Sequence, residues 1–157
     1  MTTEIRRISS KDTIPLRLEV LRPGRPRESA SFPGDDALTT VHLGALRQGQ
    51  LLGIASLYEA EMPERSGGRA LQLRGMATAP AARGTGLGQA LLLACIELAR
   101  EKPVELLWCN ARTTAAGFYL KLGFEIVGDQ FEIPDVGPHF RMALKIRMTN
   151  DERNHKS

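Results

Sequence analysis

Residues 71–102 carry the pattern that most restricts how this chain can fold, because a strand-like run, a glycine-rich turn and a helix-like run follow one another there. In the first run, apolar and polar side chains alternate with the two-residue period of a strand, and Gly75 falls on the apolar face with Leu73. Pro80 ends this run, since proline cannot donate to the hydrogen-bond ladder of a sheet. From Gly86 onward, apolar residues recur every three or four positions, which predicts an amphipathic helix.

The turn between strand and helix, residues 83–88 (RGTGLG), is suited to binding a phosphate or pyrophosphate. The first N–H groups of a helix lack intrahelical partners and lie at the positive end of the helix dipole. Glycines let an anion approach them, Arg83 adds positive charge, and Thr85 either caps the helix or donates its hydroxyl to the anion. A Walker lysine is absent, and the third glycine of a dinucleotide fingerprint falls one position early, at Gly88. The alternative is a turn that only joins a strand to a helix.

Length and composition are those of one ordinary soluble domain. The net charge of +3 is too small to indicate a nucleic-acid partner, and no apolar run approaches the roughly 20 residues of a membrane span. No signal peptide is recognisable, and Cys95 and Cys109 lie in apolar segments, so we expect a cytoplasmic protein with reduced thiols. We expect a single domain over residues 1–147 and a polar, disordered tail over residues 148–157.

The order of strand and helix patterns predicts an α/β (α+β) fold, with a mixed, mainly antiparallel central sheet of six to seven strands and helices on both faces. Strand patterns cover residues 4–8, 39–47, 51–61, 70–78, 104–109, 124–127, 131–133 and 139–146. Helix patterns cover residues 11–21, 86–102 and 113–122. Thr113 is expected to cap the last helix, and Gly123 to end it in a left-handed conformation. The loop over residues 22–36 is either a binding loop or a solvated connection.

Two motifs resemble the GNAT superfamily of acyl-CoA-dependent N-acetyltransferases. The pattern Arg83-x-x-Gly86-x-Gly88 resembles the family's pyrophosphate-binding motif R/Q-x-x-G-x-G/A. Residues 116–124 resemble its A-x-x-F-Y-x-x-x-G-F signature, and the order of expected elements over residues 4–146 is similar to that of the family fold. Two separate motifs make this resemblance more specific than either motif alone.

A narrower resemblance links the chain to the ElaA-type branch of that family. It is carried by Leu16, Arg17, Val20, residues 34–36 (GDD), His42 and residues 136–142 (VGPHFRM). The isoleucine of the branch motif is absent from this last segment and the spacing before it differs, so we infer no substrate from the branch.

The family resemblance implies transfer of an acetyl group from acetyl-CoA to a primary amine of a small molecule or peptide, by direct attack in a ternary complex. Acetyl-CoA, released as coenzyme A, would be the co-substrate, and a homodimer would match many relatives. No metal, nucleic acid or membrane partner is implied. The residues that the resemblance assigns to the cofactor are Met76, Ala77, Thr78, Arg83, Gly84, Thr85, Gly86, Leu87, Gly88, Gln89, Asn110 and Phe118.

Tyr119 matches the family's general acid, which would protonate the departing thiolate. Its alternative role is that of a helix tyrosine with its ring in the core. The general base stays open, because the strand over residues 70–78 carries no carboxylate where many relatives have a glutamate. His42 and His139 are candidates, since imidazole changes its charge near neutral pH, but each could be a structural histidine.

Other routes for the amine proton are equally open. Glu59 is a further candidate base, and attack through a chain of water molecules needs no single base. Asp35 and Asp36 either attract a cationic amine or only solvate their loop. A non-catalytic acyl-CoA-binding sensor with the same fold is the alternative function.

Overall fold

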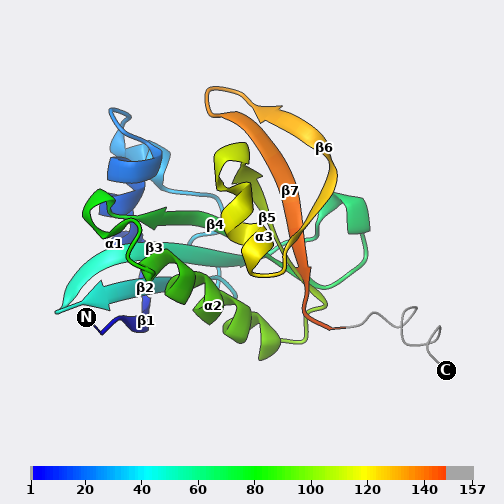
Figure 1. Cartoon of the computed structure of the whole chain (residues 1–157), viewed down its shortest axis with the longest axis horizontal. Helices are drawn as coiled ribbons and strands as arrows, with labels where there is room; N and C mark the ends of the chain where they lie inside the picture. The colour runs from blue at the N-terminus through cyan, green and yellow to red at the C-terminus, as the bar shows by residue number, and fades with distance from the viewer. Residues whose placement is uncertain (1, 148–157) are drawn as a thin grey trace. The chain divides into compact units, whose positions relative to one another are not determined.

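The computed structural model describes residues 2–147 and contains a seven-stranded sheet in the order β1-β2-β3-β4-β5-β7-β6 (Figure 1). The strands are β1 (Glu4–Ile8), β2 (Val41–Arg47), β3 (Gln50–Glu59), β4 (Ala70–Thr78), β5 (Leu106–Arg112), β6 (Glu125–Ile133) and β7 (Gly137–Lys145). The α-helices of this part of the chain are α1 (Ser10–Leu16), α2 (Leu87–Arg100) and α3 (Ala116–Lys121). Short π- or 3₁₀-helical turns are η1 (Arg17–Leu21), η2 (Arg27–Ala30), η3 (Pro63–Arg65), η4 (Pro80–Ala82) and η5 (Thr113–Ala115). The predicted mixed, mainly antiparallel sheet with helices is confirmed.

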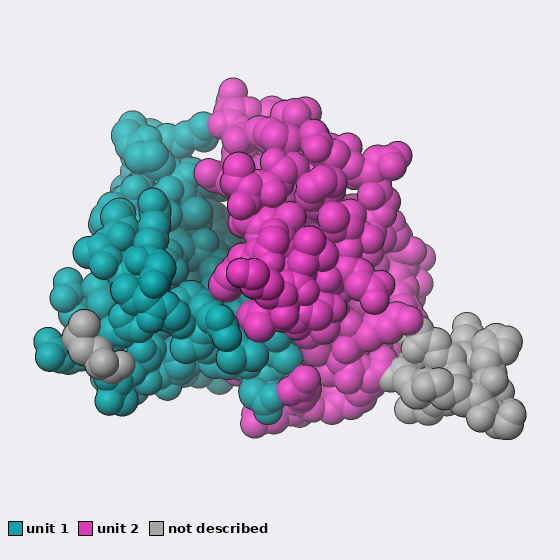
Figure 2. All heavy atoms as spheres, in the orientation of Figure 1, with its two compact units in different colours: residues 1–58, 73–97 teal, residues 59–72, 98–157 magenta. Residues whose placement is uncertain are grey.

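The contacts of the chain group it into two compact units, which Figure 2 colours separately. Unit 1 comprises Met1–Tyr58 and Leu73–Glu97, and unit 2 comprises Glu59–Gln72 and Leu98–Ser157. The single domain expected over residues 1–147 stays a prediction, and the expected tail over residues 148–157 lies outside the described residues. No helix between residues 2 and 147 has the length and apolar character needed to cross a membrane.

In unit 1, helices cover both faces of β3. Gly53 lies so close to α2 that a Cβ at this position would come within 2.5 Å of the Leu87 side chain. The next residue, Ile54, is fully buried and belongs to a core cluster that includes Leu16 of α1. Because successive strand residues point to opposite faces, α1 and α2 pack on opposite sides of β3.

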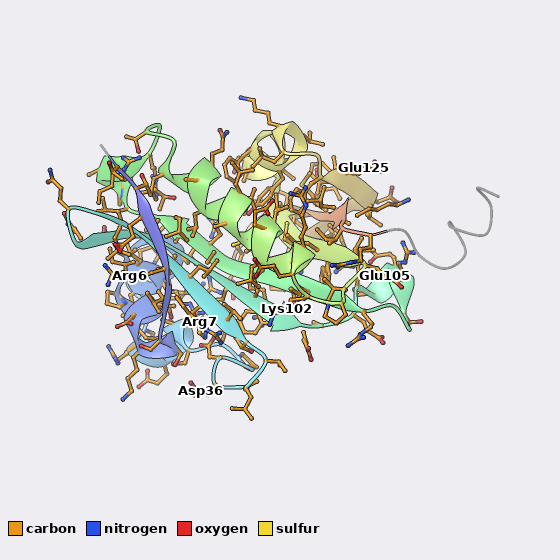
Figure 3. The ribbon with its side chains drawn as sticks, turned by 90° about the horizontal axis from the view of Figure 1, so that it is seen from below. Arg6, Arg7, Asp36, Lys102, Glu105 and Glu125 are labelled. Atoms are coloured by element: carbon orange, nitrogen blue, oxygen red, sulfur yellow. The ribbon has the colours of Figure 1, made fainter. Side chains whose placement is uncertain are left out.

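The predicted hairpin is formed by β2 and β3. Its turn residues, Gln48 and Gly49, have φ angles of 51° and 76°, and positive values at both positions match the twist of a two-residue hairpin turn. On its other side, β2 pairs antiparallel with β1, an edge strand of the sheet. Figure 3 labels Arg6 and Arg7 on this edge strand.

In unit 2, α3 ends as predicted at Gly123, which has a φ of 98°. The Phe124 N–H donates to the Tyr119 carbonyl (3.2 Å) and the Gly123 N–H to the Leu120 carbonyl (3.1 Å), the two bonds of a Schellman motif. The Phe124 ring packs on the Tyr119 ring, with centroids 5.4 Å apart. The apolar contact that accompanies such a motif therefore fixes the position of Tyr119 at the end of α3.

Three local predictions need correction. Thr113 begins the 3₁₀ turn η5 rather than capping α3; the helix starts after Ala115, whose side chain makes no capping hydrogen bond. The predicted helix over residues 11–21 reaches Leu21, but it widens into a π-helix after Leu16. The two short strands predicted within residues 124–133 are one strand, β6, with an irregularity between Val127 and Phe131.

Gly75 also departs from the alternation predicted for β4. Its φ of 64° is outside strand geometry, and a Cβ there would lie 3.1 Å from Phe32 Cε2 and 3.3 Å from Arg17 Nε. The strand is therefore irregular at this point, and the backbone of Gly75 lies against Phe32 and Arg17 instead of continuing the apolar face of Leu73.

Arg17 is the residue that ties the loop over residues 22–36 to the rest of unit 1. It is completely buried, and its Nη1 lies 2.7 Å from Asp35 Oδ2 and 2.9 Å from the Ala30 carbonyl oxygen. Its Nη2 donates to Asp35 Oδ1, Ser56 Oγ and Tyr58 Oη, each at 3.1 Å. Asp35, at the end of this loop, is therefore held by a buried ion pair, whereas residues 23–28 are exposed, and a role of the loop in binding stays a prediction.

Asp35 is charged within this network. Burial alone would raise the pKa of its carboxyl, but hydrogen bonds from Arg17, Tyr58 and the Phe32 N–H lower that pKa below its ordinary value. Burial and the bond to Asp35 raise the pKa of Tyr58 to about 12. A lowered folded-state pKa stabilises the fold above the unfolded pKa of about 3.9, and this stabilisation is lost as the pH falls through the folded value.

Both cysteines of the chain are buried free thiols. Cys95 lies in α2 and Cys109 in β5, and burial raises the pKa of each thiol to about 12.

Replacing Arg17 by Met is expected to lower the free energy of unfolding by about 3–5 kcal/mol, because Asp35 is then left charged and buried. Urea denaturation measures this loss. Arg6→Met is the matched control, since the pair of Arg6 with Glu4 is more than half exposed and should contribute at most about 1 kcal/mol. Equal stability of the two variants would contradict the role given to Arg17.

Candidate functional site

The glycine turn before α2 has the backbone that an anion-binding site needs. Gly84 and Gly86 have φ angles of 74° and 85°, and beyond the adjacent residues of the chain no atom lies within 4 Å of the position of a Cβ at either glycine. The first backbone bond of α2 joins the Ala90 N–H to the Gly86 carbonyl (3.0 Å), so the N–H groups of residues 87–89 have no intrahelical acceptor. These residues are at the positive end of the helix dipole, where a phosphate is stabilised.

Thr85 stabilises this turn through Arg47. The Thr85 hydroxyl donates to the Ala82 carbonyl oxygen and accepts from Arg47 Nη1 at 2.8 Å. Arg47 Nη2 also donates to the Thr85 carbonyl (3.1 Å). The hydroxyl and the carbonyl of Thr85 therefore both have partners, which leaves the backbone N–H of Thr85 for a ligand. Sequence reasoning missed Arg47, because nothing in the sequence links the end of β2 to residue 85.

Unit 1 brings together most of the residues predicted to bind the cofactor. Met76, Ala77 and Thr78 end β4 and lead through η4 directly into the glycine turn. Met76 and Thr78 are partly exposed, whereas Ala77 packs in the core with Ile54. The end of β4, the turn and the first residues of α2 thus form one continuous stretch over residues 76–89. Asn110, Phe118 and Tyr119 belong to unit 2.

Within unit 2, Asn110 is oriented by its cross-strand neighbour Arg141. Arg141 Nε donates to Asn110 Oδ1 (3.1 Å), and its Nη1 forms an ion pair with Glu64 (2.9 Å). The Arg141 guanidinium carbon also lies 5.4 Å from the centre of the Trp108 ring, whose Nε1–H donates to the Ala60 carbonyl. With its oxygen occupied, Asn110 has its amide N–H groups to offer to a ligand.

Tyr119 has a buried ring in an aromatic cluster. Its centroid lies 5.2 Å from that of Phe118 and 5.4 Å from that of Phe124, both in edge-on arrangements. Edge-to-face packing of this kind fixes the ring plane, so the direction of the phenol oxygen is set by the core of unit 2.

The two candidate histidines differ in how their nitrogens are used. His42 Nε2 lies 2.8 Å from the Asp35 carbonyl oxygen, which only accepts, so Nε2 carries the proton. His42 Nδ1 then accepts from the Ser56 hydroxyl at 2.6 Å. Both nitrogens of His42 therefore have partners inside unit 1, as in a structural histidine.

In His139, Nδ1 donates to the Gly137 carbonyl oxygen at 2.8 Å, and the neutral ring therefore presents Nε2 as an acceptor. No hydrogen bond within residues 2–147 engages this Nε2. The Phe131 ring lies beside the imidazole, with centroids 6.0 Å apart. In this tautomer the lone pair of His139 Nε2 can accept a proton, as a general base requires.

The two aspartates of the loop have separate roles. Asp35 is bound by Arg17, as described above, whereas Asp36 is exposed and accepts a hydrogen bond from the Ser10 hydroxyl (2.8 Å). Figure 3 shows Asp36 projecting at the periphery of the chain. Asp36 is the one of the pair whose carboxylate is open to a cationic group in solution.

Comparisons with known proteins place the chain in a family. The model of the acetyltransferase (GNAT) family matches residues 6–124. A protein of Bacillus subtilis (strain 168), named as the uncharacterized N-acetyltransferase YitI, is 35% identical over 144 residues, which cover 92% of this chain and 97% of the relative.

Solved structures share the fold at low sequence identity. Escherichia coli ElaA matches with a TM-score of 0.74 and 18% identity over 94% of this chain and all of its own. An aminoglycoside 6'-N-acetyltransferase complexed with coenzyme A matches with a TM-score of 0.70 and 16% identity, over 94% of this chain and 99% of its own. The family model and the relative from B. subtilis show that the chain is an acyltransferase of the acetyltransferase (GNAT) family, and the solved structures share its fold.

Proposed function

We propose that this acyltransferase binds acetyl-CoA and transfers the acetyl group to a primary amine of a small molecule or peptide, by direct attack in a ternary complex. The observation that supports this proposal most is the open glycine turn at the start of α2, with its positive φ angles at Gly84 and Gly86. The coenzyme A bound to the aminoglycoside acetyltransferase of similar fold is consistent with the same donor. A cytoplasmic location and a homodimer belong to the proposal as well.

The pyrophosphate would accept hydrogen bonds from the backbone N–H groups of residues 84–89, and Arg83 would add its charge. The backbone of residues 76–78 would pair with the acetylated pantetheine arm, while Asn110 and Phe118 contribute further contacts. Arg47 fixes the turn through its hydrogen bonds to Thr85. Because the turn is already ordered, less conformational entropy is lost when the cofactor binds.

In the transfer step, the neutral amine nitrogen forms a bond to the thioester carbonyl carbon and negative charge develops on the carbonyl oxygen. The carbon–sulfur bond then breaks, and the nitrogen loses one proton, which balances the proton that the departing thiolate takes up. We assign protonation of the departing thiolate to Tyr119. The only other tyrosine, Tyr58, already donates its proton to Asp35 and has a pKa of about 12. It is therefore a poor proton donor.

A protonated amine must lose a proton before it attacks, since its ordinary pKa is near 10. Of the two histidines, we propose His139 as the base, because its Nε2 is an acceptor without a protein partner among residues 2–147. His42 would have to break its bond with Ser56 first. Glu59 and a chain of water molecules remain as the competing routes.

Acetyl-CoA should raise the melting temperature by mass action, and Gly86→Asp should remove most of this shift by placing a charge against the pyrophosphate. At 100 times the Kd, the wild-type shift corresponds to about 2.7 kcal/mol, or roughly 5–11 °C for a domain of this size. Differential scanning fluorimetry measures it. Gly128→Asp is the control, because Gly128 has a φ of 75° and equally open space in unit 2. If acetyl-CoA raises the melting temperature of the Gly86 variant as much as that of the wild type, the cofactor assignment is wrong.

Tyr119→Phe keeps the ring and deletes only the hydroxyl. Since proton transfer by a placed side chain contributes about 10²–10⁴-fold, kcat should fall at least about tenfold, with CoA affinity and melting temperature near wild type. The fall should shrink with an acetyl donor whose leaving thiol is more acidic. The release of free thiol in stopped assays gives kcat. If the Phe variant turns over as fast as the wild type under conditions where chemistry limits the rate, the hydroxyl is not the acid and Tyr119 only packs in the core.

His139→Gln should lower kcat at least about tenfold at neutral pH while the protein stays folded, since it removes the base. His42→Gln should instead lower the melting temperature, because its two buried hydrogen bonds belong to the Arg17 network. Measuring turnover and unfolding for both variants separates the two roles. Full activity of the His139 variant would favour Glu59 or a water chain. CoA binding without turnover of any amine by the wild type would point to a sensor.

A further inference from the structure

Arg74, on β4, is a cation without a counter-ion among the described residues. Its guanidinium carbon lies 5.3 Å from the centre of the Phe32 ring and 5.1 Å from that of Tyr58. No hydrogen bond or ion pair joins its side chain to any residue between 2 and 147. The two rings hold the guanidinium through cation–π contacts, which leave its N–H donors unused.

Asp35, which binds the hydroxyl of the same Tyr58, is not available as that counter-ion. Its Oδ1 accepts from Arg17 (3.1 Å) and Tyr58 (2.5 Å), and its Oδ2 accepts from Arg17 (2.7 Å) and the Phe32 N–H (2.8 Å). These bonds fill the lone-pair positions of a carboxylate. Asp35 balances the charge of Arg17, and the charge of Arg74 stays unbalanced.

The position of Arg74 is built into the strand. At Gly75 the backbone of β4 comes so close to Phe32 and Arg17 that a Cβ would lie 3.1 Å and 3.3 Å from their atoms. This close approach holds the strand at Arg74 against the aromatic pair. Arg74 is partly exposed, so its unused donors can reach a ligand.

We propose that Arg74 binds the carboxylate of the acceptor and that the acceptor is an α-amino acid; this inference rests on the proposed function. The planar guanidinium offers two parallel N–H donors that match the two oxygens of a carboxylate. Arg74 precedes Met76 by two residues, at most about 7 Å of chain, and Met76 begins the segment that we assign to the acetylated pantetheine arm. Amine and carboxylate are one carbon apart in an α-amino acid, which suits so short a distance.

A phosphate of the cofactor is a less suitable partner for Arg74. Along the chain, residues 76–78 and η4 (Pro80–Ala82) separate Arg74 from the glycine turn. The pyrophosphate and the Arg74 ligand would therefore lie at opposite ends of the segment assigned to the pantetheine arm.

Isothermal titration of the CoA-saturated protein tests this inference. The probes are the common α-amino acids and the α-carboxamide of each, which keeps the amine and side chain but loses the negative charge. At least one amino acid should bind, and its carboxamide should bind at least tenfold more weakly. Arg74→Gln should weaken binding of the acid by roughly 10- to 150-fold, the usual range for a charged hydrogen bond, and should leave the carboxamide unaffected.

Two further variants complete the series. Arg74→Lys keeps the charge without the planar fork and should give an intermediate affinity. Arg25→Gln removes an exposed arginine of the same unit and should bind amino acids like the wild type. The CoA affinity of Arg74→Gln should stay within twofold of wild type.

The inference is overturned if no amino acid binds, if acids and carboxamides bind alike, or if Arg74→Gln binds the acid as tightly as wild type. Failure of the proposed function looks different. A protein that binds amino acids through Arg74 but gives no thermal shift with acetyl-CoA keeps the carboxylate site and loses the acetyl-CoA assignment.

Discussion

The buried ion pair of Arg17 with Asp35 is the interaction on which the rest of unit 1 depends. A guanidinium can be fully buried only if its charge and donors are matched, and here a carboxylate, a carbonyl and two hydroxyls match most of them. The same pair closes the long loop over β3, orders Phe32 and keeps Tyr58 and Ser56 in fixed directions. His42 is then locked by Ser56 and by the backbone of Asp35.

Local signals predicted much of the fold, including the glycine turn of the candidate cofactor site. The hairpin turn at Gln48, the helix end at Gly123 and the glycine turn at residues 83–88 are each determined by a few neighbouring residues, so a sequence pattern reveals them. The Arg17 network joins residues 13 to 41 positions apart, and Arg47 reaches Thr85 over 38. No local pattern encodes such pairings. The prediction that Thr113 caps α3 was wrong because the 3₁₀ turn η5 lies between Thr113 and the start of the helix.

Charge is distributed along one continuous segment of unit 1 in a way that suits two different anions. The glycine turn offers unsatisfied N–H groups with Arg83 beside them, whereas Arg74 offers a guanidinium in cation–π contact with two rings. Met76 to Thr78 lie between these groups in the sequence and bear no formal charge. A modest net charge of +3 thus conceals locally concentrated positive sites, and composition alone could not reveal a preference for a carboxylate.

The burial of both cysteines has a practical consequence for studying the enzyme. A thiol whose pKa is raised to about 12 has almost no thiolate at neutral pH, and the thiolate is the form that reacts with disulfide and maleimide reagents. Cys95 and Cys109 should therefore not react with such reagents as long as the protein is folded. A chromogenic disulfide added during turnover would then count the coenzyme A released in the proposed reaction, and the wild-type sequence can be used without replacing either cysteine.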